Sequence, residues 1–321
     1  MQDAPSRLQV RLAADAASVP AARRFVADGL AAWGEAKLVD AAELVASELS
    51  SNAALHAMAE FMLVTLERAA DDAAGVRVAV EDDGLVGIEA VLPRVPTGDD
   101  LDWGELDATG RGLTIVAMLA GRWGVDETLG GKRVWADLVP EPAHEALDPE
   151  RAGTGTRPSD GELPPGWALV RLVQCPVALS LRQDSHLDEL VRELQLLGVA
   201  EHDSESAAIA EEIQDLLVSP THARLTGRRA AEQARDDHVD AVDVDMAMPR
   251  EFGVLAEQLH RAIARADRLC EEGRLLTLAS PPELREIRAW MTHEVIGQTT
   301  RGAAPTSWPD WLAVVPADHA G

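Results

Sequence analysis

The sequence ELVASELSSNAALH, from Glu43 to His56, has the spacing of an α-helix with one polar and one apolar side. Glu48 and Asn52 are four residues apart, so they share a helix face on successive turns, and His56 follows one turn later. A carboxylate can orient or deprotonate a hydroxyl group or water, and an amide oxygen can hold Mg²⁺. Such a pair is also typical of an ordinary solvated helix face, so its interpretation depends on the rest of the chain.

Segments with the alternation of β-strands lie on both sides of this helix. A preceding helix is predicted to be capped by Ser18, to start at Pro20 and to end near Gly34. The predicted strands of this part cover residues 8–12, 61–66, 76–80, 88–92, 123–125 and 133–139. The order of one strand, two helices, then strands with a late helix predicts an α+β two-layer sandwich, with helices on one face of a mixed sheet.

Two acidic residues, Asp82 and Asp83, end the strand VRVAVED just before Gly84. A carboxylate at the edge of a sheet can accept a hydrogen bond from an exocyclic amine such as adenine N6. Gly84 and Gly87 allow the backbone to come close to a ring. The pattern leaves open which aspartate has this role, and an ordinary acidic turn also fits it.

Residues 110–112, Gly-Arg-Gly, stand directly before an apolar helix. Glycines at a helix start expose backbone N–H groups, and the positive end of the helix dipole favours anions, so this junction predicts a phosphate site. Arg111 can add a charged contact, although a flexible loop-to-helix junction also fits the sequence. Lys132, after a Gly-Gly turn, is either a further contact or a surface lysine.

Composition divides the chain into a first domain (1–140), a linker rich in proline, glycine and charge (141–166), and a second domain (167–321). The second domain is predicted to be mainly helical, with a tail that carries Trp308 and Trp311 and folds back onto it. Its predicted helices cover residues 186–197, 204–218, 221–237, 250–272 and 281–298, and strand-like alternation occurs at 170–181 and 239–248.

The net charge and the cysteine content of the chain argue against some classes of function. The net charge of −26 repels phosphate backbones and anionic lipid, so direct nucleic-acid binding and a membrane role are not expected. Two cysteines without metal-type spacing fit a reduced compartment, and the amino terminus lacks a signal-peptide pattern. We therefore expect a cytoplasmic protein.

Taken in order, the motifs E-L-x-x-N-A-x-x-H, V-x-D-x-G, G-R-G-L-x-I-V and G-K-x-V-W resemble the GHKL (histidine-kinase-like) ATPases over residues 7 to 139. Within that superfamily the chain is similar to the anti-sigma-factor serine/threonine kinases of actinomycetes. The resemblance implies a Bergerat ATP-binding fold that binds ATP and Mg²⁺. Glu48 would be the general base and Asn52 the Mg²⁺ ligand. The residues implied to bind the nucleotide are Asn52, Asp82 or Asp83, Gly84, Gly87, Thr109, Gly110, Arg111, Gly112, Leu113 and Lys132, with residues 93–109 as a lid.

The resemblance implies a kinase that transfers the ATP γ-phosphate to a Ser or Thr of an antagonist protein, with a sigma factor or that antagonist as partner and with a homodimer left open. The alternatives are a non-catalytic nucleotide-dependent switch and a histidine kinase. For the last, Ser185-His186-Leu187-Asp188 is the only faint signal, and we interpret His186 as a surface residue. The glycine box is one residue longer than usual and the lid is acidic, so nucleotide binding is expected ahead of turnover. Residues 266–298 loosely resemble a segment that follows such domains, which favours a regulatory or partner-binding second domain.

Overall fold

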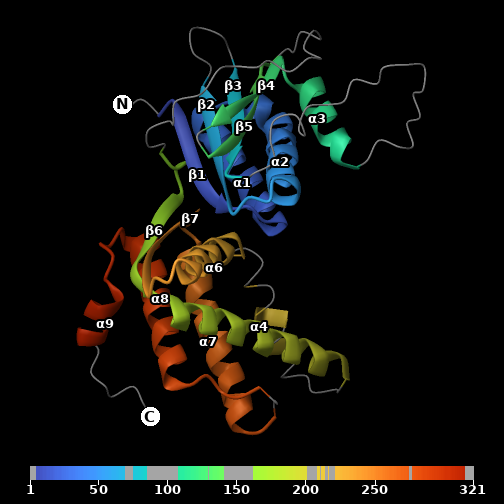
Figure 1. The fold of residues 1–321 in the computed structure, drawn as a ribbon. Helices are drawn as coiled ribbons and strands as arrows, with labels where there is room; N and C mark the ends of the chain where they lie inside the picture. The colour runs from blue at the N-terminus through green and yellow to red at the C-terminus, as the bar shows by residue number, and fades with distance from the viewer. Residues whose placement is uncertain are drawn as a thin grey trace. The chain divides into compact units, whose positions relative to one another are not determined.

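The computed structural model describes residues 5–68, 75–84, 108–128, 130–140, 162–200, 208–209, 211–213, 216, 221–274 and 277–314. The chain forms two compact units, Met1–Pro165 and Gly166–Gly321, which are described separately below (Figure 1). Several predicted features lie outside the described residues. They are Gly87, the strand at 88–92, residues 93–107 of the lid, most of the 141–166 linker and most of the helix at 204–218.

The first unit is built on a five-stranded sheet with the strand order β1-β2-β3-β5-β4. Its strands are β1 (Arg7–Ala13), β2 (Phe61–Arg68), β3 (Val76–Asp82), β4 (Arg122–Thr128) and β5 (Gly131–Leu138). The pairings between these strands are antiparallel. A parallel bridge adds Glu162 beside Leu8, with the Gln9 N–H donating to the Glu162 carbonyl at 2.8 Å. The predicted α+β sandwich is confirmed, but its five described strands pair antiparallel and do not form the mixed sheet that we expected.

Helices α1 (Val19–Trp33) and α2 (Val39–His56) pack against each other and cover one face of the sheet (Figure 1). A third helix, α3 (Ala108–Leu119), packs on α2. The side-chain period of two in a strand separates an apolar face toward the helices, with Val78 and Val80, from a charged face on which Arg77 pairs with Asp137 at 2.6 Å.

Two details of the first unit differ from the sequence prediction. Ser18 precedes α1, but its backbone is already helical and its side chain makes no capping hydrogen bond. Asp15 caps instead, accepting the Ala17 N–H at 2.9 Å at the start of a short 3₁₀ helix, Ala16–Ser18. The helix after the lid begins at Ala108, so the Gly-Arg-Gly sequence lies within it and not before it.

The second unit combines a two-stranded antiparallel sheet with long helices. The described elements are β6 (Trp167–Pro176), α4 (Val177–Ala200), α6 (Thr221–Asp236), β7 (Ala241–Pro249), α7 (Phe252–Glu271), α8 (Pro282–Arg301) and α9 (Trp308–Val314). The strand-like alternation at 170–181 holds only to Pro176. Val177 and Leu181 instead occupy one face of α4 and pack on α6, because residues four apart meet on a helix.

The carboxyl-terminal tail folds back onto this unit, as predicted. Trp308 packs edge-on against the buried Trp290, with ring centroids 5.4 Å apart. The Trp290 indole Nε1–H donates to the Thr306 carbonyl at 3.0 Å, which gives the buried ring its polar partner. None of the described helices combines the length and the apolar content that crossing a bilayer requires.

Candidate functional site

Glu48 and Asn52 lie on one face of α2, and both side chains are half-buried. Neither Glu48 nor Asn52 makes a side-chain hydrogen bond or ion pair to another residue in the part of the chain that the structure describes. Both side chains are therefore free of such contacts within the described part of the chain and are available to a ligand on successive turns of one helix face.

Glu48 lies against the start of α3. A Cβ atom added to the buried Gly112 would come within 2.5 Å of the Glu48 Oε2 atom. Glycine at position 112 therefore lets the backbone of α3 approach the carboxylate more closely than any side chain would allow. The predicted base and the predicted phosphate-binding segment are brought together here.

Thr109, Gly110 and Arg111 form the first turn of α3, where backbone N–H groups have no partner within the helix. Their side chains lie outside what the structure describes, so the expected contact from Arg111 stays a prediction. Leu113 is 5 % exposed and anchors the start of the helix in the core. An anion held by this turn would lie beside Glu48.

Asp82 ends β3 on the sheet face that the helices cover, and it is buried with Lys132 of β5. The Lys132 Nζ donates to Asp82 Oδ1 at 3.0 Å, and the Gly84 N–H donates to the same oxygen at 3.1 Å. Burial raises the pKa of Asp82 above its ordinary value, while the hydrogen bond and charge of Lys132 and the Gly84 N–H act in the opposite direction. Among the described residues both hydrogen bonds fall on Oδ1 and none falls on Oδ2.

Asp83 points elsewhere. Its Oδ1 accepts hydrogen bonds from the backbone N–H groups of Glu60 at 2.8 Å and Phe61 at 3.1 Å, and the residue is exposed. It therefore fixes the start of β2. Gly84 packs on the end of α2, where an added Cβ would overlap the Ala57 carbonyl.

These contacts order the site along α2. Glu48 lies by α3, Asn52 follows one turn later, and Ala57 lies beside Gly84 at the end of β3. Nine residues of helix separate Glu48 from Ala57, which is about 14 Å at 1.5 Å per residue. The first turn of α3, where we expect an anion, and the buried aspartate thus stand at opposite ends of the candidate site.

The residues present fit ATP and Mg²⁺. Because Gly112 has no side chain, the backbone at the start of α3 lies directly beside the Glu48 carboxylate, where phosphate oxygens held by α3 would be close to it. No group of three or more His, Cys, Asp or Glu among the described residues could hold a metal alone. Mg²⁺ does not need one, because it keeps several waters and is usually held by one or two protein oxygens together with substrate phosphates. Asn52 can supply such an oxygen.

The sequence analysis did not assign a role to Gly131, yet the structure places it against the site. An added Cβ would overlap the Asp82 carbonyl oxygen and come within 3.0 Å of the Asp83 Cα, whereas nothing lies within 4 Å of a Cβ at the neighbouring Gly130. The repeated Gly-Gly in the turn is the only sequence signal of this close approach.

We expect Gly131→Ala to destabilise the first unit by about 1–3 kcal/mol, because two backbones must separate to admit the methyl group. Gly130→Ala, its matched control, should have almost no effect. Peptide-resolved hydrogen exchange of β3 and β5 measures both variants in the context of the whole chain. Equal protection in the two variants would contradict the close approach.

Comparison with known families agrees with this geometry. Residues 12–138 match the family model of the histidine kinase-like ATPase domain. Comparison with curated proteins and with solved structures finds no match. The match begins in β1 and ends with β5, so it spans the sheet, α1 to α3 and every site residue discussed above. The first unit of this chain is therefore a histidine kinase-like ATPase domain, the ATP-binding domain of the GHKL superfamily.

Proposed function

We propose that this ATP-binding protein is a serine/threonine protein kinase of the anti-sigma-factor type. The observation that carries the proposal is the approach of the Glu48 carboxylate to Gly112, in the segment where α3 can hold an anion. A general base must stand within reach of the hydroxyl group that attacks the transferred phosphate. Among the described residues, Glu48 is the carboxylate that lies beside the start of α3.

The other residues position the nucleotide. Asn52 would hold Mg²⁺ through its amide oxygen, and the bound ion would neutralise charge on the phosphates. Asp82 accepts the adenine N6–H through Oδ2, while Lys132 fixes the carboxylate through Oδ1. Of the two aspartates, Asp82 has the orientation for this role, because Asp83 is bonded to the start of β2.

A sigma factor or its antagonist is the proposed partner, on the strength of the motif resemblance. The sequence signal for a histidine kinase at His186 is weakened. We expected this residue to be a free surface side chain, and it is not. It is half-buried, and its Nε2 lies 3.0 Å from the Ser280 Oγ in a hydrogen bond. Its pKa is lowered by burial and by the Arg288 charge, partly offset by Asp267 and Glu189.

The test is transfer of label from γ-labelled ATP with Mg²⁺ to a panel of purified antagonist proteins from the same genome. Acid-stable label on a Ser or Thr, formed by the wild type and reduced at least a hundredfold in Glu48→Gln, would support the kinase. Tight ATP binding by both proteins without any label would favour the non-catalytic switch. Acid-labile label on His186 would favour the histidine kinase.

A further inference from the structure

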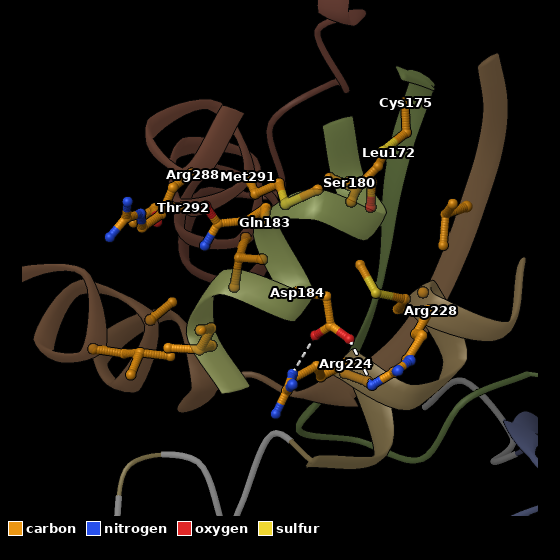
Figure 2. Close-up of a pocket in the computed structure, with 18 of the residues that line it drawn as sticks. Leu172, Cys175, Ser180, Gln183, Asp184, Arg224, Arg228, Arg288, Met291 and Thr292 are labelled. Atoms are coloured by element: carbon orange, nitrogen blue, oxygen red, sulfur yellow. Dashed lines mark hydrogen bonds and ion pairs between the residues drawn. The ribbon is translucent and has the colours of Figure 1, made fainter. Parts of the chain in front are cut away.

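The second unit has a partly open cavity of about 220 Å³ between its two strands and the helices α4, α6, α7 and α8 (Figure 2). The lining is mostly apolar and rich in sulfur, with Met246, Met248, Met291 and Cys175. Methionine side chains adapt to ligands of different shape. Protein interiors are otherwise close-packed, so a space of this size requires an explanation.

Two buried polar side chains in the lining have an atom without a partner. The Gln183 Oε1 and the Arg288 Nε make no hydrogen bond to any described residue, although Gln183 is only 8 % exposed and Arg288 only 7 %. Figure 2 shows Gln183 of α4 and Arg288 of α8 on the same side of the cavity. Buried unpaired groups of this kind are rare in native proteins. One atom is an acceptor and the other a donor, which together match a single group that donates and accepts.

The charges around the cavity compensate one another. Asp184 pairs with Arg224 and, at 3.0 Å, with Arg228 (Figure 2). Asp188 pairs with the same two arginines. These two acids and two bases link α4 and α6 beside the cavity and compensate one another's charge.

Arg288 is compensated as well. Its Nη1 lies 3.5 Å from the Asp267 Oδ2, and its Nη2 donates to the Ser280 Oγ. His260 is another polar lining residue, and its Nδ1 also has no hydrogen-bond partner among the described residues. Burial and the Arg288 charge lower its pKa, which disfavours the charged form of its ring. An ionised ligand would have to enter this mostly apolar space without a free counter-charge from these residues, which is costly.

We propose that this cavity binds a small, uncharged, mainly apolar molecule whose one polar group both donates to Gln183 and accepts from Arg288. A hydroxyl group or a primary carboxamide on an aromatic or aliphatic body has this chemistry. A cavity of 150 Å³ accommodates benzene, so 220 Å³ accommodates about nine heavy atoms by the same measure. The site is separate from the nucleotide site and does not depend on the proposed kinase activity.

The test uses four probes of similar size on the full-length chain, namely benzyl alcohol, benzamide, toluene and benzoate, with dissociation constants from ligand-observed NMR. Benzyl alcohol and benzamide should bind more tightly than benzoate. Gln183→Leu should weaken both about tenfold and leave toluene unaffected, because one hydrogen bond is lost while shape is kept. The matched control, Gln233→Leu on the exposed side of α6, should bind all probes as the wild type does.

A second variant keeps the test decisive. Ala256→Leu adds side-chain volume at a half-buried lining position and should abolish binding of every probe. Unchanged binding in Ala256→Leu would place the probes elsewhere and overturn the proposal. Tighter binding of benzoate than of benzyl alcohol would overturn the uncharged class, and no binding of any probe to the wild type would show that the cavity holds only water.

Discussion

Asn52→Ala is expected to abolish the Mg²⁺-dependent part of ATP binding, with a loss of affinity of at least a hundredfold in the presence of Mg²⁺. Changes to groups that merely support a metal ligand cost about 10–100-fold, so removal of the ligand itself should cost at least as much. The effect should be smaller when ATP is titrated without Mg²⁺, because the adenine contact at Asp82 is unchanged. Calorimetric titration with and without Mg²⁺ measures both numbers.

The fold should survive this substitution. The Asn52 side chain makes no hydrogen bond to a described residue, and alanine has a higher helix propensity than asparagine, so α2 should be slightly more stable. Ser51→Ala is the matched control. Ser51 is equally half-buried on the same helix but lies about 100° around it.

Three results would change the interpretation. Mg²⁺-dependent binding that persists in Asn52→Ala would remove Asn52 from the metal site. An equal loss in Ser51→Ala would show that the helix surface as a whole is responsible. Absence of ATP binding by the wild type would exclude both the kinase and the nucleotide switch, and would leave an ATPase fold that serves protein contacts.

The alternation of side chains along a strand is enough to predict from the sequence which of Asp82 and Asp83 faces the helices. In VRVAVED, Val78, Val80 and Asp82 alternate onto one face, and the apolar valines identify it as the face that the helices cover. Asp83 follows on the other side. The two were left open because the glycine box, DDGLVGI, is one residue longer than usual, so the motif alone fits either aspartate.

Other features require the tertiary structure. Ser18 has the residue type of a helix cap, but the 3₁₀ helix before α1 gives the capping role to Asp15. The Asp82–Lys132 pair depends on the register between β3 and β5, which lie 50 residues apart in sequence. The cavity of the second unit is still harder to predict from the sequence, because its lining residues come from two strands and four helices.

Lys132→Met is expected to destabilise the first unit by about 3–5 kcal/mol at pH 8, because it leaves the Asp82 carboxylate buried without its counter-charge. The side chains of Lys132 and Asp82 are only 6 % and 3 % exposed, so water cannot replace the lost partner. The chain has one other lysine, Lys37, which is exposed, and Lys37→Met is the matched control with a small expected effect. Peptide-resolved hydrogen exchange of β3 and β5 localises the loss to this unit.

The loss should depend on pH with a definite sign. Burial already raises the pKa of Asp82, and removing Lys132 takes away the two largest influences that lower it, so the pKa rises further in the variant. An acid whose pKa is higher in the folded than in the unfolded state destabilises the fold when ionised. This penalty is complete above the folded pKa and disappears as the pH falls toward the unfolded value. The difference between Lys132→Met and the wild type should therefore be smaller at pH 5 than at pH 8.

A double variant separates this charge effect from lost packing. Asp82→Leu in the Lys132→Met background removes the isolated carboxylate and should restore much of the stability at pH 8, although it also removes the proposed adenine contact. It should also remove the dependence on pH. A double variant as unstable as Lys132→Met, or a loss that grows as the pH falls, would show that Lys132 stabilises the sheet through its aliphatic chain and not through Asp82.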